Sequence, residues 1–130
     1  MTTILKAKEI VDLQTEEIKS QVAKLSFSPK LKVILIGNNP NSQIYVKRKK
    51  EFCEKIGAKC EIIECDQNFS PDELRQLLSS INRDSTTHGC LVQLPLPPQF
   101  QGFNFQHLIS PDKDVDGFHQ KNIFSIYQNQ

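Results

Sequence analysis

A lysine falls within the apolar stripe of one helix-forming segment of the chain. The stripe recurs at helical spacing, at Tyr45, Lys49, Phe52 and Ile56. Two interpretations of Lys49 are open. Its stem can cover apolar surface while the ammonium stays in water, or the amine is partly desolvated and exchanges protons with a substrate. In the second case Tyr45, one turn earlier on the same face, supplies an aromatic platform beside the amine.

Further polar residues could complete a site with Lys49. Gln93 ends an apolar, strand-forming segment, and its amide can both accept and donate hydrogen bonds, which suits holding an amine in one orientation. A hydrogen-bonded core amide is the alternative. Asp116 lies in a loop of alternating carboxylates, and one carboxylate can accept two parallel N–H bonds from a flat heterocycle. The loop lacks the glutamate that an EF-hand requires at its twelfth position, where Ile123 stands, so we expect no calcium site.

Several common site patterns are missing from the sequence. The histidines form no i, i+4 pair and the cysteines no Cys-x-x-Cys pair, so we expect no metal site. The glycines do not have the spacing of Gly-x-Gly-x-x-Gly or of a P-loop, so we expect no nucleotide site in this chain. The residues concerned are His88, His107, His119, Cys53, Cys60, Cys65, Cys90, Gly37, Gly57, Gly89, Gly102 and Gly117.

Length and composition indicate one globular domain. The 130 residues are 38% hydrophobic and 24% charged, which suffices for a core. Sixteen basic against fifteen acidic residues leave a net charge of +1, so we expect neither a nucleic-acid nor a membrane partner. The basic run at 47–50 is followed by glutamates and is interpreted as a solvated helix face. No apolar stretch approaches the ~20 residues of a membrane span, and we expect a cytoplasmic chain with reduced cysteines.

Helices and strands alternate along the sequence. Apolar periodicity predicts a first helix from Ala7 to about Leu25, and Ser42 is expected to cap a second helix that ends near Ile56, before Gly57. A third helix follows the capping sequence Ser70-Pro71-Asp72-Glu73. Strands are predicted at 31–37, 59–65 and 89–94, a short helix at 104–109, and no complete element in the last dozen residues.

This alternation predicts an α/β fold. Strands separated by helices of this length build a small, mainly parallel sheet covered on both faces, in three layers. Ligands of such sheets bind outside the carboxyl ends of the strands. We therefore expect a site between segment 38–49 and the residues Val92, Gln93 and Leu94.

Three separated segments carry a family resemblance. IGNNPNSQIYVKRKKEFCEKIGA, HGCLVQLPLP and PDKDVDGFH resemble, in this order, signature segments of the bifunctional methylenetetrahydrofolate dehydrogenase/methenyltetrahydrofolate cyclohydrolase family of one-carbon metabolism. The resemblance implies the fold of an amino-acid-dehydrogenase-like N-terminal domain. It implies oxidation of methylenetetrahydrofolate with NADP, followed by hydrolysis of the methenyl product to formyltetrahydrofolate, without a metal.

The resemblance also implies roles for individual residues. Tyr45 stacks on the aromatic part of the folate, Lys49 is the acid/base group, Gln93 orients Lys49, and Asp116 binds the pterin. Val92 and Leu94 flank Gln93 in the substrate-binding segment, and Asp114 is a structural loop residue.

The resemblance covers only the N-terminal half of a family member. We expect residues 1–118 to form the folate-binding catalytic domain and residues 119–130 to begin the connection toward a C-terminal Rossmann domain that is absent here, with its NADP site. The chain alone should then be deficient in the dehydrogenase step, and a monomer or weak dimer where the full-length family forms homodimers. The alternatives are a non-catalytic folate-binding or interaction module, and a cyclohydrolase that works without NADP.

Overall fold

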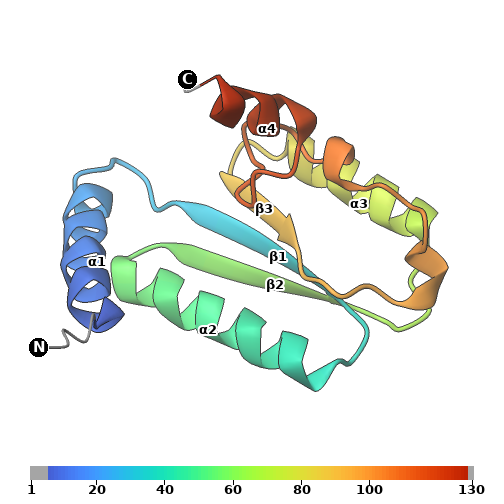
Figure 1. Ribbon diagram of the computed structural model, residues 1–130, viewed down its shortest axis with the longest axis horizontal. Helices are drawn as coiled ribbons and strands as arrows, with labels where there is room; N and C mark the ends of the chain where they lie inside the picture. Colours follow the sequence, from blue (N-terminus) through green and yellow to red (C-terminus); the bar gives the residue numbers. More distant parts are fainter. Residues whose placement is uncertain (1–5, 129–130) are drawn as a thin grey trace, which may run out of the picture.

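A three-stranded parallel sheet forms the centre of the computed structural model, which describes residues 6–128 (Figure 1). The strands lie in the order β2-β1-β3, so that β1 has a neighbour on each side. The elements are α1 (Ala7–Ala23), β1 (Lys30–Ile36), α2 (Pro40–Ile56), β2 (Lys59–Cys65), α3 (Pro71–Arg83), β3 (Gly89–Val92), η1 (Pro98–Phe100), η2 (Gln106–Leu108) and α4 (Gln120–Tyr127).

Helices cover both faces of this sheet. Helix α2 lies on one face and α1 packs against α2, whereas α3 lies on the other face (Figure 1). The predicted three-layer α/β fold with a small parallel sheet is therefore confirmed. The layers arise because each connection between neighbouring parallel strands must cross a face of the sheet, and a helix does this while satisfying its own backbone hydrogen bonds.

Strand β1 supplies the middle of the core. Its residues 33–36 are at most 4% exposed, as predicted for a strand buried on both faces. Successive side chains of a strand point to opposite faces. Ile34 and Ile36 accordingly pack with the α3 residues Leu74 and Leu78, while the alternate residues of β1 pack with Val46 of α2.

The start of α2 differs from the prediction. Asn39, not Ser42, is the N-cap: its side-chain oxygen accepts hydrogen bonds from the backbone N–H groups of Asn41 and Ser42, at 3.0 and 3.1 Å. Pro40 fits the first turn, where no N–H is needed. Ser42 is instead buried inside the helix, and its hydroxyl donates to the carbonyl of Leu94 at 3.4 Å. The helix ends at a left-handed Gly57 (φ 85°), as predicted.

The third helix follows its sequence signals closely. Ser70 Oγ accepts the backbone N–H of Glu73 at 3.2 Å, and the Glu73 carboxylate accepts the backbone N–H of Ser70 at 2.7 Å. Both partners of the predicted capping box are thus in place. All the information for this helix start lies within four consecutive residues, which explains why local sequence sufficed.

Other predicted boundaries need correction. Strand β3 ends at Val92 and not at Leu94, because the chain turns away before the cis peptide bond between Leu94 and Pro95. The short helix expected at 104–109 is reduced to the single turn η2. The last dozen residues were predicted to lack a complete element but contain α4, which His119 caps by accepting the Lys121 N–H at 3.1 Å. Residues 129 and 130 lie outside the described part of the chain.

Helix α1 is confirmed, but its apolar residues are not buried as expected. Thr15 is its one buried residue, whereas Ile10 is 61% and Leu13 is 74% exposed. The reason is that α1 packs against one side of α2 and touches little else (Figure 1). Within residues 6–128, no helix combines the length and apolar character needed to cross a membrane.

Candidate active site

A hydrogen bond joins the two residues that sequence analysis placed at the centre of the site. Lys49 Nζ, on α2, donates to Gln93 Oε1 at 2.7 Å. Gln93 follows β3 directly, and its own backbone N–H donates to the carbonyl of Ile34 at 2.9 Å, which continues the parallel pairing. Its Nε2 donates to the carbonyl of Leu94 at 3.0 Å. Because both ends of the amide are used, its oxygen is held toward the lysine.

An open cavity of about 650 Å³ contains this pair. Tyr45 and Lys49 lie on the α2 side of the cavity, and Asp116 comes from the loop that follows η2. Its lining residues are Leu31, Tyr45, Arg48, Lys49, Phe52, Cys53, Leu91, Gln93, Val115 and Asp116. The tertiary structure therefore brings together four predicted site residues, Tyr45, Lys49, Gln93 and Asp116.

Val92 and Leu94 do not line this cavity. Val92 is 3% exposed and belongs to the core on the α3 side of the sheet. Leu94 is 45% exposed and lies past the end of β3. Alternation along the strand explains the result, since the neighbours of a residue that faces α2 must face away from it.

The cavity also reaches back from the carboxyl end of β3, toward the start of the strand, which was not predicted. It includes Leu31 and Leu91, so it extends along the strands rather than sitting only beyond their carboxyl ends. The cause is the loop at 112–117, which pairs with β3: the backbone N–H of Cys90 donates to the carbonyl of Lys113 at 2.7 Å, and Cys90 forms a parallel bridge with Asp114. This pairing brings Asp116 to the side of the sheet.

Hydrogen bonds on both sides fix the loop that carries Asp116. Asp114 accepts N–H groups from Gly117, His119 and the Asn122 side chain, at 3.0, 2.8 and 2.9 Å. Burial acts to raise the pKa of Asp114, but these hydrogen bonds to its charged form outweigh burial and hold the pKa below its ordinary value. The Lys113 ammonium donates to three carbonyls at the end of α3, at 2.7 to 3.1 Å.

The electrostatic setting of Asp116 differs from that of Asp114. Loss of hydration raises the pKa of Asp116 above its ordinary value. The positive charge of Lys49 acts to lower this pKa, and the negative charge of Asp114 adds to the rise. A carboxylate that has lost part of its hydration and has few internal partners is suited to accept hydrogen bonds from a ligand.

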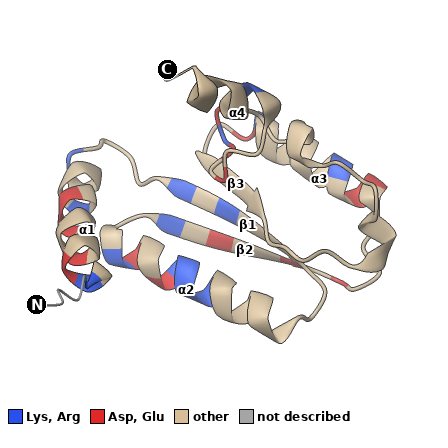
Figure 2. Cartoon of the chain, viewed as in Figure 1, with Lys and Arg blue, Asp and Glu red and all other residues tan. Residues whose placement is uncertain are grey.

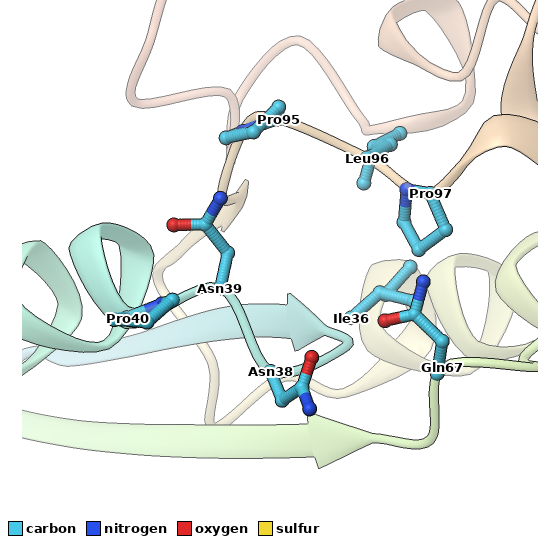
Figure 3. Close-up of a pocket in the computed structure, with 8 residues that line it drawn as sticks. All are labelled: Ile36, Asn38, Asn39, Pro40, Gln67, Pro95, Leu96 and Pro97. Carbon is cyan, nitrogen blue, oxygen red and sulfur yellow. The ribbon is translucent and has the colours of Figure 1, made fainter.

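A second cavity, of about 290 Å³, lies at the carboxyl ends of the strands (Figure 3). Asn38 and Gln67 point toward it from the ends of β1 and β2, opposite Pro95 and Pro97. It has no acidic or basic lining residue, and the side-chain oxygen of Asn39 is occupied in capping α2. Of these two cavities, the larger is therefore the one that can supply acidic and basic groups.

The cysteines do not provide an alternative reactive group. Burial raises the pKa of Cys60 to about 11 and that of Cys90 to about 12, so both thiols are protonated at neutral pH. Cys53 lines the larger cavity, but burial raises the pKa of its thiol as well. No group of three or more His, Cys, Asp and Glu residues that could hold a metal occurs within residues 6–128.

A dinucleotide does not fit the turn between β1 and α2, the place where such folds bind the phosphates. The first backbone N–H groups of α2 are already bonded to Asn39, and Pro40 has none to offer. The described residues thus leave no open helix N-terminus there for a diphosphate.

Comparisons with known proteins agree with the geometry. The family described as "Tetrahydrofolate dehydrogenase/cyclohydrolase, catalytic domain" matches residues 5–116, which include the four predicted site residues of the larger cavity. The chain belongs to this family. Its predicted family resemblance is therefore confirmed.

Tetrahydrofolate dehydrogenase/cyclohydrolase relatives are about twice as long as this chain. The bifunctional protein FolD of Oceanobacillus iheyensis is 44% identical over 126 residues, covering 95% of this chain and 44% of the relative. A FolD structure from Campylobacter jejuni superimposes with a TM-score of 0.90 at 36% identity, over 97% of this chain and 46% of that one. The structure of a methylenetetrahydrofolate dehydrogenase from the silkworm superimposes with a TM-score of 0.92 at 30% identity, over 97% of this chain and 45% of that one. The chain thus spans less than half of these relatives.

Sequence reasoning missed part of the cavity wall. Cys53 lies one turn after Lys49 on the same helix, so its position could have been inferred from the apolar stripe. Val115 could not, because only the pairing of its loop with β3 brings it there. Arg48 was interpreted as part of a solvated helix face; it is exposed, and it also lines the cavity.

Proposed function

We propose that this chain is the folate-binding catalytic domain of a bifunctional enzyme of one-carbon metabolism. The whole enzyme would oxidise methylenetetrahydrofolate and hydrolyse methenyltetrahydrofolate to formyltetrahydrofolate. The observation that carries the proposal is the Lys49–Gln93 hydrogen bond of 2.7 Å inside a cavity that also contains Asp116. An amine held by a neutral amide, beside a carboxylate, suits proton transfer on a flat, nitrogen-rich substrate.

Lys49 would move the proton in the hydrolytic step. Water adds to the methenyl carbon and gives up a proton, and the carbon then separates from one ring nitrogen as that nitrogen gains a proton. The amine of Lys49 accepts the proton from water and returns it to the leaving nitrogen. Gln93 Oε1, by accepting one Lys49 N–H, keeps the rest of the amine directed at the reacting carbon.

Asp116 and Tyr45 would hold the substrate. A carboxylate matches the ring N–H and exocyclic amine of a pterin, which present two parallel donors. Tyr45 is 54% exposed, so its ring face is available to stack on the aminobenzoyl group. The pterin would therefore lie between α2 and the loop at 112–117, with its reacting carbon near Lys49.

The dehydrogenase step needs a hydride acceptor, which in the proposed whole enzyme is NADP. Because the turn before α2 does not fit a dinucleotide, no part of this step is assigned to the chain's own residues. We propose residues 1–118 as the folate domain and residues 119–130 as the start of the connection to a cofactor domain. The chain alone is then deficient in the oxidation.

The test is the spectrophotometric decay of methenyltetrahydrofolate with the 130-residue chain, corrected for uncatalysed hydrolysis. Lys49→Ala should abolish the catalysed rate. Lys47→Ala is the matched control, because Lys47 lies on the same helix but pairs with Glu51 at 4.0 Å and lines a different cavity. An equal rate in wild type and Lys49→Ala would contradict the proposed role of Lys49.

A folate-binding module without turnover is the second candidate. The openness of the site favours it, since Tyr45, Phe52 and Val115 are each at least 40% exposed and water is not excluded from the cavity. Folate binding without any Lys49-dependent hydrolysis, in a folded sample, would select this candidate over the catalytic one.

A further inference from the structure

An arginine at the cavity has no partner within the described part of the chain. Arg48 lines the cavity, lies one turn after Tyr45 on α2, and is exposed. Among residues 6–128, neither a hydrogen bond nor an ion pair engages its guanidinium. A guanidinium presents a planar fork of donors that matches a carboxylate.

The neighbouring basic residues are placed differently. Figure 2 shows the band of Lys and Arg in the middle of α2. Within it, Lys49 is bonded to Gln93, while Lys47 and Lys50 line a separate cavity toward β2, where Lys47 pairs with Glu51. Arg48 is thus the remaining cation of this band on the side of the proposed substrate.

Charge is also unevenly distributed around the larger cavity. Asp116 is its acidic residue, and the positive charge that acts on Asp116 is that of Lys49. Arg48 shares the helix face with Tyr45 and Phe52, whose rings supply apolar surface beside it. A ligand that carries donors at one end and a carboxylate at the other would match both groups.

We infer that Arg48 binds the carboxylates of the glutamate tail of the folate, an inference that rests on the proposed function. A folate presents, in order, a pterin, an aminobenzoyl ring and a glutamate. With the pterin at Asp116 and Lys49 and the ring on Tyr45, the glutamate comes next. Arg48, one turn along α2 from Tyr45, meets it with a bidentate pair of hydrogen bonds. Arg48 is therefore a specificity residue for glutamylated folates.

The experiment measures binding by calorimetry to the 130-residue chain. The probes are 5-formyltetrahydrofolate and 5-formyltetrahydropteroate, which lacks the glutamate. Arg48→Gln should weaken binding of the folate about fivefold, as expected for one exposed ion pair, and leave binding of the pteroate unchanged. The difference should shrink as salt is raised. Lys47→Gln is the control of equal charge change and should alter neither affinity.

The outcomes separate the inference from the function beneath it. Equal wild-type affinity for the two probes, or an equal loss for both in Arg48→Gln, would overturn the role of Arg48 while leaving folate binding intact. Failure of the folded wild-type chain to bind either probe would overturn the proposed function and the inference with it. Circular dichroism of each variant confirms that the fold is retained.

Discussion

Lys49 and Gln93, which are 44 positions apart in sequence, are joined by a hydrogen bond of 2.7 Å between Nζ and Oε1. The bond connects α2 to the residue that follows β3, across the edge of the cavity that contains Asp116. Gln93 is held by its own backbone and side-chain hydrogen bonds, so it acts as a fixed acceptor. The orientation of the lysine therefore depends on a residue that does not itself need to exchange a proton.

Replacing the acceptor tests this dependence. Gln93→Ala should lower Lys49-dependent hydrolysis of methenyltetrahydrofolate by roughly tenfold or more, because the amine is no longer directed at the reacting carbon. The Gln93→Glu variant keeps the size of the side chain but places a carboxylate against the lysine. The carboxylate stabilises the ammonium form, so the pH at which activity rises should move upward. A pH profile that is unchanged in Gln93→Glu would contradict the role assigned to Gln93.

The raised pKa of Asp116 should make the stability of the chain depend on pH. Its pKa is raised in the folded state, so the folded chain holds the proton more tightly than the unfolded chain. The resulting contribution to stability is present below about pH 4, the ordinary pKa of an aspartate, and is lost as pH rises through the raised value. Asp116→Asn should therefore be more stable than wild type at pH 7 and equal to it below about pH 4, by urea unfolding.

The same substitution should harm ligand binding. Asn presents one acceptor and one donor where the pterin offers two donors, so binding of 5-formyltetrahydrofolate should weaken at pH 7. Greater stability combined with weaker binding is characteristic of a functional group that is costly to the fold. Unchanged folate affinity in Asp116→Asn would remove Asp116 from the proposed site.

The lowered pKa of Asp114 should give the opposite dependence of stability on pH. Its pKa is lowered by hydrogen bonds from Gly117, His119 and Asn122, so its contribution to stability is present above the ordinary pKa and is lost as pH falls through the lowered value. Asp114→Ala should cost about 1 to 3 kcal/mol of unfolding free energy at pH 7, and less at pH 3. Asp112→Ala, an exposed position in the same loop, is the control and should have little effect.

A pair of leucines tests the layering of the fold. Leu78 of α3 is fully buried against β1, so Leu78→Ala should lower the unfolding free energy by about 2 to 5 kcal/mol. Leu13 of α1 is 74% exposed, and the matched Leu13→Ala variant should change the unfolding free energy by less than about 0.5 kcal/mol. A large loss for Leu13→Ala, measured by urea unfolding, would mean that α1 packs differently from the arrangement in Figure 1.

Local sequence by itself determined the features whose causes lie within a few neighbouring residues. The helix start at Ser70 follows from a reciprocal pair of hydrogen bonds with Glu73, and the buried strand β1 follows from its continuous apolar run. The apolar stripe of α2 likewise identified Lys49 and Tyr45, because helical periodicity alone puts them on one face.

Only the tertiary structure decided which long-range partners those residues meet. Asn39 and not Ser42 caps α2, because Ser42 is buried and its hydroxyl donates to the carbonyl of Leu94. The tertiary structure brought Asp116 beside Lys49 through the pairing of a loop with β3, and it turned Val92 away from the cavity. Such placements depend on contacts between segments far apart in the chain, and no local periodicity encodes them.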